Sequence, residues 1–138
     1  MNSQTRTLAE RCPAGRRLSS GELKSLHPSA PELLKLPRRP VMGVLENIRS
    51  LGNVGSIFRS ADAVRFEQLY LCGYTGHPPR PEIEKTALGA TQSVPWSYWS
   101  KSTEALLWLR ESGYQILALE ITTKSAPLDE IELHSPVA

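Results

Sequence analysis

The chain has 138 residues, of which 40% are apolar and 22% charged, values typical of one ordinary globular domain and not of a disordered chain. No apolar run is long enough to span a bilayer, and residues 1–40 lack the apolar centre of a signal peptide, so we expect no membrane partner. Cys12 and Cys72 have neither metal-ligand spacing nor a disulfide framework. We therefore expect a reduced, cytoplasmic protein that binds no metal.

The net charge of +2 is unevenly distributed along the chain. Residues 1–40 carry eight basic and three acidic side chains, whereas residues 41–138 carry eight basic and eleven acidic ones. Prolines at 28, 31, 37 and 40 interrupt long helices, so we expect a basic arm over 1–40, partly disordered or with short helices. Such an arm, ending in Arg38 and Arg39, suggests a polyanionic partner, with a solvated leader as the alternative.

From Val41 onward, strand and helix patterns alternate. Strand patterns lie at 41–45, 68–72, 94–99 and 115–121. Helix patterns lie between them: the first helix has Asn53 as its expected N-cap, and two more follow at 82–88 and 102–112. The alternation predicts an α/β fold, a mostly parallel Rossmann-like sheet with helices on both faces. The apolar stripes of the first and last helices are Val54, Ile57, Phe58, Ala61 and Val64, and Ala105, Leu106, Trp108 and Leu109.

The loop and helix after the first strand concentrate polar residues. They include Asn47, Arg49, Gly52, Asn53 and Gly55. Helical spacing puts Gly55, Arg59 and Asp62 along one side, where a bare glycine lets a ligand backbone approach beneath Arg59. The helix N-terminus favours a phosphate there. The alternative is a solvated Arg59–Asp62 pair beside glycines that only shape a turn.

The segment from Asn47 to Asp62 resembles motif 1 of the SpoU (TrmH) family of RNA ribose methyltransferases. The similarity continues through residues 71–79 and 84–91, and it extends over residues 41 to about 124. Val64 and Arg65 depart from the aromatic-plus-small pair expected at the end of this helix.

The resemblance implies a knotted α/β domain of the SPOUT type, usually a homodimer, that uses S-adenosylmethionine to methylate a ribose 2′-hydroxyl in tRNA or rRNA. Asn53 and Arg59 carry over as catalytic residues, and Gly55 as the close-approach glycine. Because a guanidinium stays charged, Arg59 is expected to orient the hydroxyl and to stabilise its developing negative charge. We expect the remaining RNA contacts at Asn47, Arg49, Arg38 and Arg39.

The cofactor loop and the knot-forming segment of the family have no counterpart before Ala138, although residues 135–138 look like the entry to another buried strand. We therefore expect residues 41–138 to be an incomplete form of the methyltransferase domain that binds S-adenosylmethionine weakly or not at all. Within these residues, we expect Leu119, Glu120 and Ile121 to border the cofactor. A non-catalytic RNA-binding module or remnant is the alternative. The aromatic residues Trp96, Tyr98, Trp99 and Trp108 are expected to pack in the core rather than to stack on bases.

Overall fold

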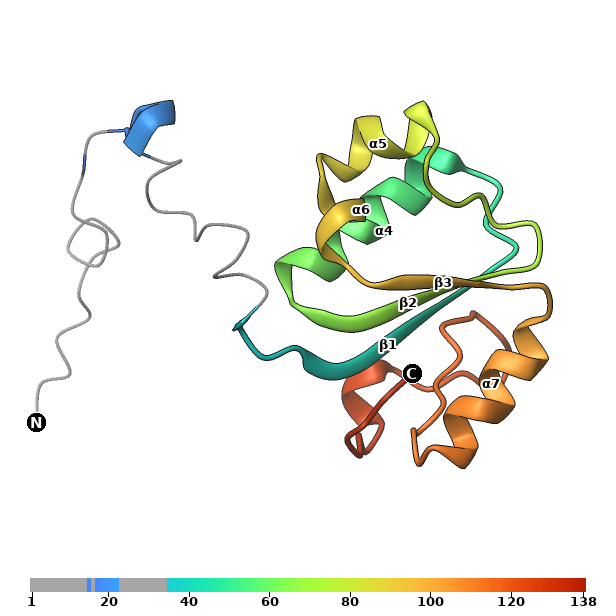
Figure 1. Ribbon diagram of the computed structural model, residues 1–138. Coiled ribbons are helices and arrows are strands. Elements are labelled where there is room, and N and C mark those ends of the chain that lie inside the picture. The colour runs from blue at the N-terminus through green and yellow to red at the C-terminus, as the bar shows by residue number, and fades with distance from the viewer. Residues whose placement is uncertain (1–14, 16, 23–34) are drawn as a thin grey trace, which may run out of the picture. The chain divides into compact units, whose positions relative to one another are not determined.

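The computed structural model describes Gly15, residues 17–22 and residues 35–138 (Figure 1). The chain divides into two units between residues 33 and 34. In the first unit, Ser19 begins a helical turn, because its hydroxyl accepts from the Glu22 N–H at 3.3 Å while the Glu22 carboxylate accepts from the Ser19 N–H at 2.9 Å. Most of the remaining arm expected over 1–40 lies outside the described residues.

The second unit contains a parallel sheet of three strands in the order β1–β2–β3. The strands are β1 (Arg39–Glu46), β2 (Phe66–Cys72) and β3 (Trp96–Trp99). In register, Leu45 pairs with Leu71, and Leu71 pairs with Tyr98, so the three carboxyl ends lie at one edge of the sheet. The first three predicted strands are confirmed, with β3 shorter at its start.

Helices cover both faces of this sheet (Figure 1). On one face lie α4 (Leu51–Ala63), α5 (Pro81–Ala87) and α6 (Ala90–Ser93), and on the other lies α7 (Ser102–Glu111). Each face has its own apolar cluster, because alternate strand residues point to opposite faces. The α4 face includes Leu45, Val54, Phe58, Leu69, Leu71 and Ile83; the α7 face includes Met42, Tyr70, Cys72, Ala105 and Leu109. The predicted α/β fold class is confirmed.

Helix α4 begins earlier than predicted. Its N-cap is Ser50, whose hydroxyl accepts from the Asn53 N–H at 3.2 Å, so the prediction of Asn53 as N-cap is wrong. A serine hydroxyl is a favoured cap, and the glycine at 52 is tolerated in the first turn because burial of Val54 and Phe58 drives the helix.

The segment after α7 differs from the strand predicted at 115–121. Gln115 makes only an isolated parallel bridge, to Val137, and Val137 bridges Val41 of β1 in the same way. Val137 therefore lies between β1 and Gln115, and the tail does run alongside the sheet as expected. Leu117 still donates its backbone N–H to the Ala138 carbonyl at 2.8 Å, but beyond Leu117 no backbone hydrogen bond joins the run to the tail within the described residues, and Leu119 is exposed. Apolar sequence alone does not show how far such backbone pairing extends.

The aromatic side chains are less buried than predicted. Trp96 and Trp99 are half-buried, but Tyr98 and Trp108 are each 49% exposed. The buried stripe of α7 is Ser102, Ala105 and Leu109, which leaves Trp108 at its margin, with its ring centroid 6.3 Å from that of Tyr70. The predicted inward position of Trp108 is therefore wrong, because a ten-residue helix on a narrow sheet buries only a narrow stripe.

Candidate functional site

Two loops at the carboxyl edge of the sheet are joined by Thr75. This threonine follows β2 and is 2% exposed. Its hydroxyl donates to the Leu45 carbonyl at 2.9 Å and accepts from the Ile48 N–H at 3.0 Å. One contact is to Leu45 near the carboxyl end of β1 and the other is to the loop between β1 and α4, so Thr75 fixes the backbone that leads to the predicted site residues. The sequence analysis did not find Thr75, because its role depends on two segments that only the sheet brings together.

Asn47 reinforces the same junction. Its side-chain oxygen accepts from the Tyr74 N–H at 3.2 Å, and its own backbone has a positive φ of 55°. Gly73 faces it with φ 63°, and a Cβ at Gly73 would lie 2.2 Å from the Asn47 side-chain oxygen. Gly73 is therefore required both by its backbone conformation and by the close approach of Asn47.

Asn53 and Arg59 lie on α4 and are both exposed. The six-residue step from one to the other corresponds to about 9 Å along the helix axis. Asp62 accepts instead from the Ser93 hydroxyl at 2.7 Å, and within the described part of the chain no ion pair joins it to Arg59. The alternative of a solvated Arg59–Asp62 pair is therefore wrong, and the Arg59 guanidinium stays available at the surface.

Gly55 does not leave a bare surface for a ligand. It is buried, and a Cβ there would lie 2.1 Å from the Thr86 hydroxyl oxygen and 2.3 Å from the Ile83 carbonyl. The prediction that Gly55 admits an RNA backbone is wrong, because α5 occupies that space. The segment that approaches Gly55 closely is a second helix of the same chain.

The three arginines predicted to contact RNA differ in exposure and in hydrogen bonding. Arg49 and Arg39 are exposed, and Arg39 is tied through its backbone N–H to the Arg65 carbonyl at 2.8 Å. Arg38 donates from its guanidinium to the carbonyls of Phe66, at 2.9 Å, and Ser93. Burial lowers the pKa of Arg38 from its ordinary value and the Arg65 cation lowers it further, while Asp62 opposes both effects. Arg38 thus links the start of β2 to the end of α6, and its role towards RNA stays a prediction.

The residues expected to border a cofactor lie in an extended, solvent-exposed segment. Leu119 and Ile121 are 87% and 95% exposed. The Glu120 carboxylate accepts from the Ile121 N–H at 2.9 Å, and the Glu120 carbonyl accepts from the Ser125 hydroxyl at 2.8 Å. These contacts stay within the segment itself and form no enclosed surface.

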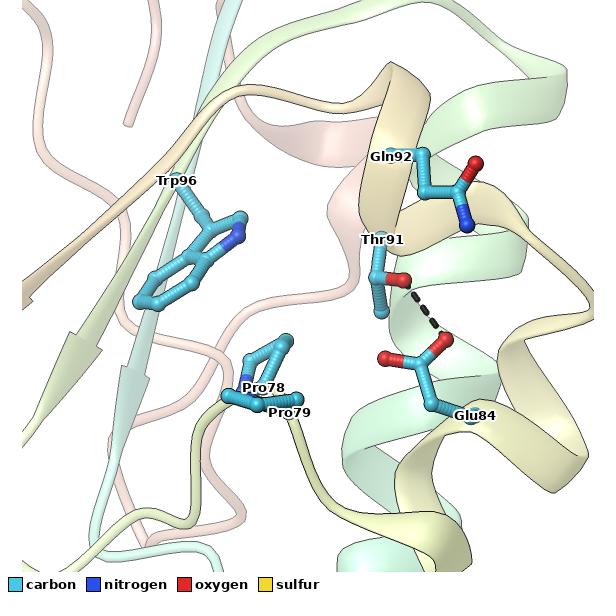
Figure 2. Close-up of a pocket in the computed structure, with 6 residues that line it drawn as sticks. All are labelled: Pro78, Pro79, Glu84, Thr91, Gln92 and Trp96. Atoms are coloured by element: carbon cyan, nitrogen blue, oxygen red, sulfur yellow. Dashed lines mark hydrogen bonds between the residues drawn. The ribbon is translucent and has the colours of Figure 1, made fainter.

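A separate hollow of about 420 Å³ lies beside α5 and β3 (Figure 2). It is lined by Pro78, Pro79, Glu84, Thr91, Gln92 and Trp96. Thr91 donates to the Glu84 carboxylate at 2.7 Å across its rim. The sequence analysis did not find this hollow, although the pair of prolines ahead of a short acidic helix was visible in the sequence.

An open parallel α/β sheet with polar loops at its carboxyl edge defines a ligand-binding domain. More specifically, residues 40–138 match the model of the SpoU rRNA Methylase family, and the chain belongs to this family. Among the described residues no helix is long and apolar enough to cross a membrane, and no group of three or more His, Cys, Asp or Glu side chains could hold a metal ion. No curated protein matches the chain.

Solved structures of related proteins share this fold. An rRNA methyltransferase from Sinorhizobium meliloti aligns with a TM-score of 0.65 and 26% identity over 76% of this chain and 41% of that protein. Its AdoMet-bound structure aligns with a TM-score of 0.63, 25% identity and the same coverage. The TrmH/SpoU tRNA modifying enzyme of A. aeolicus aligns with a TM-score of 0.68 and 22% identity over 85% of this chain and 57% of that one, a likeness of fold alone. The chain thus spans roughly half the length of these proteins.

Proposed function

We propose that this chain acts in the S-adenosylmethionine-dependent methylation of a ribose 2′-hydroxyl in tRNA or rRNA. The observation that carries the proposal is the family match over residues 40–138, which includes the whole of α4 with Asn53 and Arg59. The S. meliloti relative, an rRNA methyltransferase with an AdoMet-bound structure, supports the choice of substrate class and cofactor.

Arg59 is proposed to position the RNA rather than to remove a proton. A guanidinium has five N–H donors and no acceptor, and it stays charged at any ordinary pH. The exposed Arg59 side chain has no ion pair within the described part of the chain, so its fork of donors is available to a phosphate and the adjacent 2′-hydroxyl. Donors aimed at the developing alkoxide would lower the barrier to methyl transfer.

Asn53 is proposed to act beside Arg59 at the first turn of α4. Its backbone N–H is used by the Ser50 cap, whereas no hydrogen bond engages its side-chain amide within the described residues. An amide offers both a donor and an acceptor, so it suits a hydroxyl that must be held in one orientation.

The residues present do not fit the cofactor. Leu119 and Ile121 are almost fully exposed, and Glu120 bonds only within its own segment, so they offer no enclosed surface to an adenosyl group. We therefore expect calorimetric titration of this chain with S-adenosylmethionine to show weak uptake or none. The same exposure favours the second candidate, a non-catalytic RNA-binding module.

A methyl-transfer assay with protein from its own cell separates the two candidates. RNA from that cell is incubated with methyl-labelled S-adenosylmethionine, and label is sought at 2′-hydroxyls after digestion to nucleosides. We expect Arg59→Lys to lower turnover at least tenfold, because an ammonium cannot replace the bidentate fork. Arg110→Lys, an exposed arginine on α7, is the control and should leave turnover unchanged. RNA binding without transfer supports the binding module, and near-normal turnover of Arg59→Lys refutes the proposed role of Arg59.

Homodimerisation and a cytoplasmic location are further parts of this proposal. Both rest on the family resemblance, and the location also rests on the two cysteines, whose number and spacing in the sequence suggest no disulfide framework.

A further inference from the structure

The hollow beside β3 is built from four separate elements. Pro78 and Pro79 come from the loop after β2, Glu84 from α5, Thr91 and Gln92 from α6, and Trp96 from β3. Its volume of about 420 Å³ lies within the range of small-molecule pockets, roughly 300–1,000 Å³. None of its residues is among the predicted catalytic or RNA-binding positions, so the proposed methylation site leaves it unexplained.

We propose that this hollow binds a nucleobase that carries an exocyclic amino group, stacked on Trp96 and donating to Glu84. The proposal rests on the proposed function for the source of the base, which is single-stranded RNA. It adds a base-reading site to a protein whose other predicted contacts are with ribose and phosphate.

The stacking wall is the indole of Trp96. Figure 2 shows Trp96 and Pro78 on one side of the hollow and Thr91 with Glu84 on the other. The His77 ring stacks against the indole, with centroids 5.8 Å apart and an interplanar angle of 20°, and His77 does not line the hollow. The indole is therefore held in one orientation. Splayed bases of single-stranded RNA bind on such fixed aromatic faces.

The acceptor is the Glu84 carboxylate. One of its oxygens accepts from the Thr91 hydroxyl at 2.7 Å, which orients the group, and no hydrogen bond engages the other within the described residues. Carboxylates accept from the N4 amino group of cytosine. Uracil instead flanks its one N–H with two carbonyl oxygens, which the carboxylate repels. The negative charge likewise disfavours a phosphate as the occupant.

A competing occupant is an organic cation, which a tryptophan and a carboxylate can also attract. Aromatic cages for such cations present several ring faces, whereas among the described residues Trp96 is the one aromatic that lines this hollow. Two proline rings and one indole suit a flat base better. An organic cation is therefore the alternative occupant that the titration below tests.

The test is a nuclear magnetic resonance titration of the full chain with CMP and, in parallel, UMP. These nucleotides differ at position 4 of the base, amino in CMP and carbonyl in UMP, and consequently at N3, which accepts a hydrogen bond in CMP and donates one in UMP. We expect CMP to shift the Trp96 indole N–H and the Thr91 and Gln92 amides, with about tenfold tighter binding than UMP. Glu84→Gln should abolish that preference. Glu82→Gln removes the same charge from the exposed face of α5, outside the hollow, and should preserve it.

The outcomes separate this proposal from the proposed function. Shifts at Trp96 that favour CMP support the base site, even if no RNA is methylated. Equal binding of CMP and UMP, or no shift at Trp96, overturns it, even if methyl transfer to RNA is observed. Equivalent shifts produced by S-adenosylmethionine or by tetramethylammonium would assign the hollow to a cation and also overturn the proposal.

Discussion

The buried hydroxyl of Thr75 holds the backbone beside the candidate site in place. It donates to the Leu45 carbonyl near the end of β1 and accepts from the Ile48 N–H of the following loop, so it supplies a hydrogen-bond partner to both backbone groups. Asn47 adds a third bond across the same junction, to the Tyr74 N–H. Because hydrogen bonds fix this loop at both ends, Arg49 and the first turn of α4 lose little conformational entropy when a ligand binds.

We predict that Thr75→Val lowers the free energy of unfolding by about 2 kcal/mol, since it leaves two buried backbone groups without a partner. Urea denaturation of the full chain measures the loss. Thr103→Val, at an exposed position of α7, is the matched control and should change stability by less than about 0.5 kcal/mol. A fully stable Thr75→Val protein would contradict the role assigned to the hydroxyl.

At the scale of elements, the packing of α4 against α5 is set by a glycine. Gly55 is buried where the Thr86 hydroxyl and the Ile83 carbonyl reach the α4 backbone, and Thr86 also donates to the Gly52 carbonyl at 3.0 Å. This contact fixes α5 and, with it, the position of Glu84 at the rim of the hollow. Gly55, which the sequence predicts to face a ligand, instead allows α4 and α5 to pack closely.

We predict that Gly55→Ala destabilises the protein by about 1–3 kcal/mol, because the added methyl group forces α4 and α5 apart. Gly52→Ala, one turn earlier in α4, is the control. A Cβ there would come no closer than 3.8 Å to the Ser50 hydroxyl, so helix propensity should make it neutral or stabilising by up to about 1 kcal/mol. Thermal and urea unfolding of both variants test the pair, and equal stabilities would contradict the proposed close approach.

At the scale of the whole molecule, charge is distributed unevenly along the sequence. Basic residues outnumber acidic ones over 1–40, and the reverse holds from 41 to 138. Within the described residues, Arg49 is exposed in the β1–α4 loop and Arg59 is exposed on α4, whereas Arg38 is engaged by backbone carbonyls. A nucleic acid held by such scattered cations would be bound largely through its phosphates.

We predict that the affinity of the chain for RNA falls steeply with salt, because bound phosphates release counterions. Arg49→Gln should weaken binding of all RNA sequences and reduce the slope of log affinity against log salt by about one. Arg110→Gln on α7 removes the same charge from an exposed position on the opposite face of the sheet and should leave the slope unchanged. Fluorescence anisotropy over a salt series measures both, and a salt-independent affinity would contradict this prediction.

Much of the fold could be predicted because its signals are local. Buried surfaces are directly visible in the apolar runs at 41–45 and 68–72 and in the helical stripe of Val54, Phe58 and Ala61. The helix start was misplaced because Ser50 and Asn53 are both good caps, and spacing alone does not choose between them. The strand expected at 115–121 was too long because the segment pairs with residues 136–138 only as far as Leu117, and composition does not reveal where such pairing ends.

The α/β class, the order of the first strands and helices, and the resemblance of residues 47–62 to a methyltransferase motif can be read from the amino acids alone, since each depends on neighbouring residues or on residue identity. The folded chain was needed to learn that Gly55 faces α5, that Asp62 bonds to Ser93 instead of Arg59, and that four elements line a hollow at Trp96. Those outcomes depend on contacts between segments far apart in the chain, which form only when the sheet assembles.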